Sequence, residues 1–182
     1  MRPLPWNPPV ALSPLETKVI KQIKRAKLFS FLRLHRHELF DDAFQAELAE
    51  LFKDSTVGQA PVYPAQLALA TILQAYTDVS DDEVIEALVM DRRWQLALGC
   101  LSSEDAPFSK GTFVRFRGLL MAKDFDRRLI ERTIEVAQQT QGFSAIRLRA
   151  ALDSSPLWGA GRVEDTYNLL GHALRKAVDV IA

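Results

Sequence analysis

Residues 64–99 read PAQLALATILQAYTDVSDDEVIEALVMDRRWQLALG and contain three predicted helices. Pro64 is a suitable first residue for a helix. The run from Gln66 to Tyr76 is apolar nearly all round, which is typical of a helix buried on every side by its neighbours. We therefore expect this helix to form the core of a mainly α-helical domain.

Two further helices are expected within the same stretch. Ser80 and Glu83 have the spacing of a capping box, in which each side chain binds the backbone N–H of the other residue. The helix that they open carries inward-facing apolar side chains, which we expect to be Val84, Ile85, Leu88 and Val89. A third helix with Trp94, Leu96 and Leu98 is expected to end at Gly99, because glycine commonly terminates helices.

The chain before this stretch begins with a proline-rich arm of thirteen residues. Ser13 and Glu16 then form another capping-box pattern and predict a basic helix. Val19, Ile20 and Ile23 form its apolar stripe, and its cations are Lys18, Lys21, Lys24, Arg25 and Lys27. Asp41 or Asp42 caps the next predicted helix, on which the apolar residues Phe44, Leu48, Leu51 and Phe52 recur. A linker is expected over residues 58–64.

After a polar loop from Leu101 to Phe108, Ser109 is placed to cap a short helix, KGTFVRFRGLLMA. A longer helix is predicted from Asp124 to near Gly142. The pattern then becomes alternating, with Ile146, Leu148, Ala150 and Leu152 on one face, which predicts a strand ending at Asp153. A Gly159-Ala160-Gly161 turn and a final helix are expected to follow.

Charge is strongly segregated along a chain of 182 residues whose net charge is zero. Counting Lys and Arg against Asp and Glu gives +7 for residues 1–37, −11 for residues 38–106 and +4 for residues 107–182. Basic ends suit a protein that contacts nucleic acid phosphates. A solvated basic helix is the equally weighted alternative.

The same sequence excludes several classes of protein. Its single cysteine, Cys100, cannot form an internal disulfide framework or a thiolate metal cage. The opening residues lack the apolar run of a signal peptide, and no later segment approaches the roughly 18 apolar residues of a membrane span. We expect a cytoplasmic protein that does not associate with membranes.

Two sets of residues are candidate DNA contacts. The first lies on the predicted basic helix and comprises Lys18, Lys21, Lys24 and Arg25, for which phosphate contact is favoured over base reading. The second belongs to a helix-turn-helix-like unit over residues 82–120, whose last helix would present Lys110, Thr112, Arg115 and Arg117. That helix also has a core-facing side, so Arg115 could equally remain solvated or pair with Asp124.

Asp153 is the candidate metal ligand, because a carboxylate at the end of a strand is a common position for a hard-cation site. Taken alone, an aspartate before Ser-Ser-Pro is more often a turn former. Its surroundings add to the evidence. The segment LDSSPLWGAGRVEDTYNLLGHALRKAV, residues 152–178, resembles the region of the first catalytic aspartate in DDE-type insertion-sequence transposases.

The resemblance also extends upstream of this segment, so that in total it covers about residues 6 to 182. FDDAFQAELAELF, the stretch over residues 64–99 and FSKGTFVRFRGLL are similar to the InsH-like N-terminal domain of these transposases. The resemblance implies an RNase H-like catalytic domain in which two aspartates and one glutamate bind two divalent ions such as Mg²⁺. Asp153 matches the first aspartate. Asp165 and Asp179 match no catalytic position, so we expect this chain to be inactive alone.

The sequence thus predicts a multi-helix N-terminal domain followed by the first strand and a helix of an incomplete RNase H-like α/β domain. Its expected segments are a basic arm and helix at 1–37, a helical transposase N-terminal domain at 38–143 and the start of the catalytic domain at 144–182. The predicted function is binding of transposon inverted repeats, with Asp153 contributed to DNA transposition. Partners are expected to be further copies of the chain or a full-length transposase. Alternatives are a non-catalytic DNA-binding regulator or inhibitor, and a helical interaction module without a DNA role.

Overall fold

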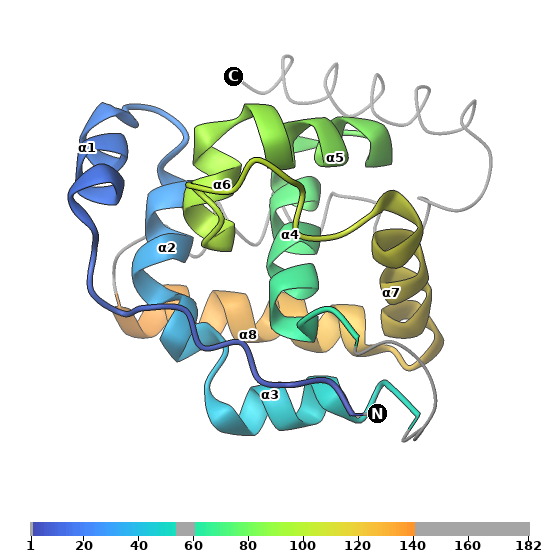
Figure 1. The fold of residues 1–182 in the computed structure, drawn as a ribbon. Helices are drawn as coiled ribbons and strands as arrows, with labels where there is room; N and C mark the ends of the chain where they lie inside the picture. The colour runs from blue at the N-terminus through green and yellow to red at the C-terminus, as the bar shows by residue number, and fades with distance from the viewer. Residues whose placement is uncertain (1, 54–60, 141–182) are drawn as a thin grey trace, which may run out of the picture.

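The computed structural model describes residues 2–53 and 61–140, and these residues form eight α-helices and no strands. The chain enters as an extended arm that crosses the front of the molecule before α1 (Figure 1). The helices are α1 (Pro14–Gln22), α2 (Lys27–Leu39), α3 (Asp42–Ala49), α4 (Pro64–Thr77), α5 (Asp81–Met90), α6 (Arg92–Leu98), α7 (Lys110–Ala122) and α8 (Phe125–Thr140). The expectation of a mainly α-helical domain is therefore confirmed for the described residues.

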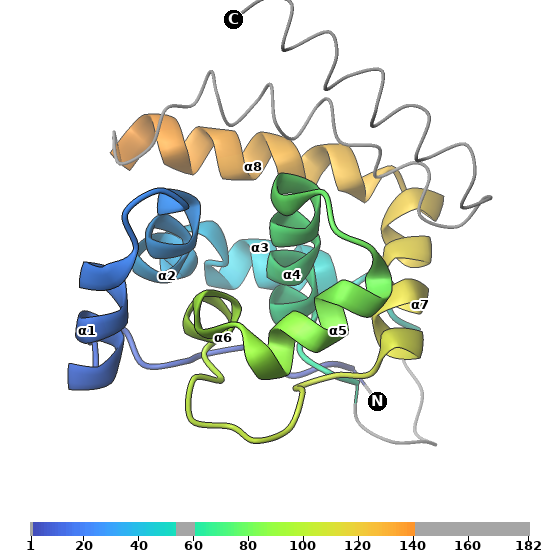
Figure 2. The same ribbon diagram turned by 90° about the horizontal axis from the view of Figure 1, so that it is seen from above.

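The central position predicted for α4 is confirmed. Every residue from Pro64 to Ala75 is buried, although α4 contains polar side chains such as Gln66 and Gln74. Viewed from above, α4 stands in the middle, with α8 on one side of it and α5 and α6 on the opposite side (Figure 2). Gln66 donates to the backbone oxygen of Leu98, and Gln74 donates to that of Val79. These hydrogen bonds compensate both side chains for the loss of water on burial.

Most helix boundaries follow local signals in the sequence. Ser13 and Ser80 both form complete capping boxes, and the side chains of Asp41 and Ser109 accept hydrogen bonds from the first turns of α3 and α7. Gly99 ends α6 with a positive φ of 69°, a backbone conformation that glycine adopts without strain. The N-caps Ser13, Ser80 and Ser109 and the terminator Gly99 were predicted, and Asp41 was one of the two candidates for the cap of α3.

One predicted helix is wrong. The basic helix was expected to continue from Lys18 through Lys27, but α1 ends at Gln22 and a second helix, α2, begins at Lys27. The chain turns between them, which brings α2 against α6 and α8. The expected basic segment over residues 1–37 thus ends inside α2, which continues to Leu39.

One of the residues expected to face inward on α5 does not do so. Val84 and Leu88 are buried and Ile85 is half-buried against the core, but Val89 is exposed. One face of α5 packs on α6 and α7, and its other face is open to solvent. None of the helices in residues 2–53 and 61–140 has the length and apolar character needed to span a bilayer. The predicted strand over 146–152 and the helix after it lie outside the described residues.

Candidate nucleic-acid interface

The basic residues of α1 and of the turn after it form a single exposed group. Lys18 and Lys21 project from α1, while Lys24 and Arg25 lie in the turn and Lys27 begins α2. All five are exposed, and within the part of the chain that the structure describes none of them forms an ion pair. We call these five residues the α1 basic surface.

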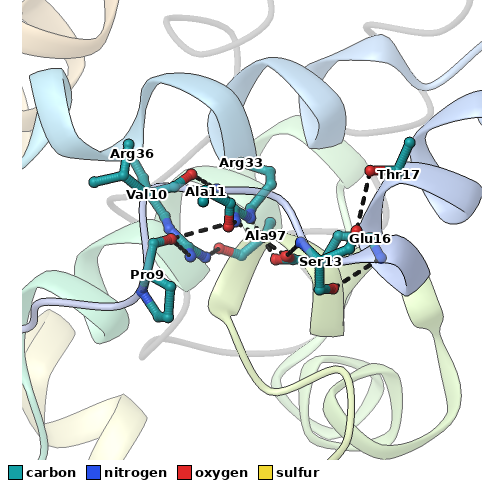
Figure 3. Close-up of polar contacts among 9 residues, drawn as sticks. All are labelled: Pro9, Val10, Ala11, Ser13, Glu16, Thr17, Arg33, Arg36 and Ala97. Atoms are coloured by element: carbon teal, nitrogen blue, oxygen red, sulfur yellow. Dashed lines mark hydrogen bonds and ion pairs between the residues drawn. The ribbon is translucent and has the colours of Figure 1, made fainter.

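The other cations of this segment have a structural role. Arg33 and Arg36, one turn apart on α2, are 1% and 2% exposed and point toward the N-terminal arm (Figure 3). The Arg33 guanidinium donates to the carbonyl oxygens of Pro9, Val10 and Ala11 at 3.1–3.3 Å and forms an ion pair with Glu16. Part of the positive charge counted over residues 1–37 is therefore inside the fold.

Arg36 completes this contact between the arm and the helices. It donates to the carbonyls of Pro9 and Ala97 at 3.1 and 3.2 Å, and its guanidinium lies 5.3 Å from the ring centroid of Trp6. Burial, and then the nearby Arg33 charge, lower the pKa of Arg36 from its ordinary value to about 10, so it stays protonated at neutral pH. Sequence patterns did not identify Arg33 and Arg36 as buried. The apolar residues around them, Phe29, Phe31 and Leu32, were the available signal.

The second predicted set, on α7, is divided between surface and interior. Arg115 is exposed, and Lys110 is exposed but lies 2.7 Å from the carboxylate of Asp82 on α5. Thr112 is half-buried, and its backbone N–H donates to the Ser109 hydroxyl in the helix cap. A phosphate at the start of α7 would therefore have to compete with Asp82 for Lys110.

Arg117 is not at the surface, contrary to the position expected for a DNA contact. It is 4% exposed, lies 2.7 Å from Asp81, donates to the Gln74 side chain and stacks 5.0 Å from the Phe113 ring centroid. The guanidinium contacts Gln74 of α4 and both carboxylate oxygens of Asp81 at the start of α5. Arg117 thus joins α7 to α4 and α5.

The predicted helix-turn-helix-like unit is also not formed as expected. Such a unit joins two helices through a turn of about three or four residues. Here the connection from α6 to α7 covers residues 99–109, and α7 packs against α4, α5 and α8. Moreover, α1 and α7 lie at opposite ends of the domain (Figures 1 and 2). The two predicted DNA-contact sets therefore do not form one surface.

The predicted metal ligand cannot be placed, because Asp153 lies outside the described residues. Within residues 2–53 and 61–140, no group of three or more His, Cys, Asp or Glu side chains is arranged to hold a metal ion.

The fold and these contacts define a helical domain with an exposed cationic surface at one end. Comparison with known families is consistent with such a domain: a family described as "Transposase domain (DUF772)" matches residues 19–119, more than half of the chain. The chain belongs to this transposase-domain family. The match begins inside α1 and ends inside α7, so it covers all of α2 through α6. No curated protein and no solved structure matches the chain.

Proposed function

We propose that this chain is the N-terminal part of a DDE-type insertion-sequence transposase and binds transposon-end DNA through the α1 basic surface. The observation that carries the proposal is the group of five exposed cations between Lys18 and Lys27, none of which is neutralised by an ion pair within the described residues. Membership of a transposase-domain family supports DNA as the partner of this surface.

The chemistry of the α1 basic surface suits phosphate contact. Lysine is a flexible point charge without the planar guanidinium fork of arginine, and four of the five residues are lysines. Contacts of this kind position a protein on the duplex, whereas base contacts specify the sequence. If all five cations neutralise phosphates, the logarithm of the binding constant should fall with the logarithm of salt concentration with a slope of about −4.5.

The test is a mobility-shift titration on a duplex that carries the inverted repeat, repeated between about 50 and 200 mM salt, the range in which phosphate contacts are lost. The variant Lys18→Gln/Lys21→Gln should weaken binding and reduce the slope by about 1.8, since each phosphate contact contributes about 0.9. The matched control is Lys53→Gln/Arg127→Gln, which removes two exposed cations from elsewhere.

Three outcomes separate the candidate functions. A slope reduced only by the α1 variant supports the proposed interface. Equal effects of both variants would mean diffuse attraction without a defined surface. No binding even at low salt would sink the DNA-binding proposal and leave a helical interaction module.

We further propose that Asp153 supplies the first carboxylate of an RNase H-like active site that binds Mg²⁺. The support is the sequence resemblance around residues 152–178. A hard divalent ion prefers several oxygen ligands, so Asp153 would need the second aspartate and the glutamate of a completed site. Adding this chain to a strand-transfer reaction run by a complete transposase tests the role. If the chain stimulates strand transfer and the Asp153→Asn variant does not, Asp153 contributes a carboxylate to the reaction. If the unsubstituted chain and the Asp153→Asn variant both inhibit strand transfer, the chain is a regulator.

A further inference from the structure

The N-terminal arm is held in the manner of a bound peptide. Trp6 is buried, and its ring packs edge-on against Phe40 with centroids 6.5 Å apart. The Gln45 side chain accepts from the Trp6 backbone N–H at 2.6 Å and donates to the Trp6 carbonyl at 3.3 Å. With the carbonyls of Pro9, Val10 and Ala11 bound by α2, the arm is recognised mainly through its backbone.

Gly99 forms part of the wall behind the arm. A β-carbon at Gly99 would lie 3.6 Å from the Pro8 β-carbon, 3.5 Å from the Trp6 ring and 3.2 Å from an Arg36 nitrogen. Residues of α2, α3 and the end of α6 therefore form a groove that accepts an extended proline-containing segment. We call this the arm groove.

The break between α1 and α2 has no local cause in the sequence. Residues 23–26 read IKRA, with neither glycine nor proline. Ala26 occupies the N-cap of α2 and provides no side-chain hydrogen bond. Alanine, arginine and lysine are all strong helix formers. Local preference thus favours a single helix through this turn. The contacts that accompany the bend are those of the arm, the Glu16–Arg33 pair and the packing of Ile23 and Ala26 against the core.

Apart from the Glu16–Arg33 pair and its packing on α6, helix α1 contributes little to keeping the bend closed, because Val19 is its only buried residue. The arm and α1 together therefore behave as a module attached through the arm groove, joined to the domain by a turn that could become helical.

We propose that two copies of this chain exchange their arms: α1 and α2 become one continuous helix in each copy, and each arm occupies the arm groove of the other. Chain geometry requires the second copy. In a continuous helix Arg36 would lie about 33 Å along the axis from Pro14, at 1.5 Å per residue. Pro9, five residues before Pro14, can extend at most about 18 Å. Pro9 then cannot reach Arg36 of its own chain.

The exchanged dimer would have two-fold symmetry and would repeat the contacts already described. The groove of each copy would bind Trp6 and the Pro9 carbonyl of the partner, and Arg33 would pair with Glu16 across the interface. Such reciprocal, self-complementary contacts close a dimer without leaving an open end. Arm exchange does not depend on DNA binding, because the contacts to the arm are made by the buried Arg33, Arg36 and Gln45 and not by the exposed cations.

The test uses disulfide trapping in a Cys100→Ala background, which removes the natural thiol. The separation of 3.6 Å between the Pro8 and Gly99 β-carbons suits a disulfide. The single variants Pro8→Cys and Gly99→Cys are purified separately, mixed and oxidised. Arm exchange predicts an interchain disulfide, seen as a dimer on non-reducing gels. Leu4→Cys, exposed on the same arm, replaces Pro8→Cys in the collision control and should give much less dimer.

The double variant Pro8→Cys/Gly99→Cys, oxidised when dilute, should form an intrachain disulfide and remain monomeric. Failure of the mixed single variants to cross-link above the Leu4 control would overturn the proposal, and so would failure of the double variant to form its intrachain disulfide.

Sedimentation of the unsubstituted chain gives a second measurement, which avoids any effect of the Gly99 substitution on the arm groove. A concentration-dependent dimer is expected, and Lys24→Gly/Arg25→Gly should weaken it, since each glycine disfavours the continuous helix about fivefold. A purely monomeric chain, or a dimer that the glycines leave unchanged, would contradict arm exchange.

Discussion

Arg33 on α2 and Glu16 on α1 form a buried two-point ion pair. Nε of Arg33 lies 2.5 Å from one carboxylate oxygen and Nη2 lies 3.1 Å from the other, with the side chains 1% and 13% exposed. Partial burial by itself raises the pKa of Glu16. The hydrogen bond from Arg33 and the backbone hydrogen bond from Ser13 outweigh that effect and lower the pKa from 4.5 to about 2. Glu16 thus links the N-cap of α1 at Ser13 to Arg33, the residue that binds the arm carbonyls.

Replacing Glu16 with Gln should destabilise the fold by roughly 3 kcal/mol at pH 7, because Arg33 would remain buried without its carboxylate. The pKa of Glu16 is lower in the folded state than in the unfolded chain. Its stabilisation is therefore fully present above pH 4.5 and is lost as pH falls toward 2. Urea unfolding of both proteins between pH 7 and pH 3 should show the difference shrinking with acidity.

Glu83 provides the control for this prediction. It occupies the same capping-box position on α5, and hydrogen bonds from Ser80 lower its pKa, but no arginine pairs with it among the described residues. Glu83→Gln should therefore cost much less than Glu16→Gln. Equal losses for the two variants would show that capping, and not the pair with Arg33, accounts for the effect.

A second prediction separates the two arginines of α7. Arg117→Met should destabilise the domain by roughly 3 kcal/mol, because Asp81 and Gln74 would lose their buried partner. The salt dependence of DNA binding should not change. Thermal unfolding and the mobility-shift slope measure the two effects on the same protein.

Arg115→Met is the matched control, since Arg115 is exposed on the same helix. Its stability should stay within about 0.5 kcal/mol of the unsubstituted chain. If Arg117→Met instead kept full stability and reduced the salt-dependence slope of DNA binding, Arg117 would contact DNA and its buried position would be contradicted.

The parts of the fold that could be predicted depend on interactions between near neighbours in sequence. Ser13 with Glu16, Ser80 with Glu83, and Ser109 with Thr112 are all within one helical turn, so their spacing alone identifies three helix starts. The burial of α4 was equally predictable, because apolar residues surround its axis.

The parts that could not be predicted depend on contacts between residues distant in sequence. Arg33 binds carbonyls more than twenty residues away, and Arg117 finds Asp81 thirty-six residues away. An arginine on an amphipathic helix gives no local sign of such a partner, so counting it as a surface cation overstates the basic surface. The bend before Lys27 has the same origin, since its own residues favour a helix.

The conformation of Gly99 leads to the last prediction. Its φ of 69° is one that other L-residues adopt at a cost of about 1–2 kcal/mol, and an added β-carbon would also press on Arg36 at 3.2 Å. Gly99→Ala should therefore lower the free energy of unfolding by about 2 kcal/mol. Gly118 offers a contrast within the same domain, because it lies inside α7 with nothing within 4 Å of an added β-carbon. Gly118→Ala should raise the free energy by about 0.5–1 kcal/mol, since alanine is the better helix former. Urea unfolding of both variants measures these opposite signs, and a stabilising Gly99→Ala would contradict both the left-handed conformation and the close approach of Arg36.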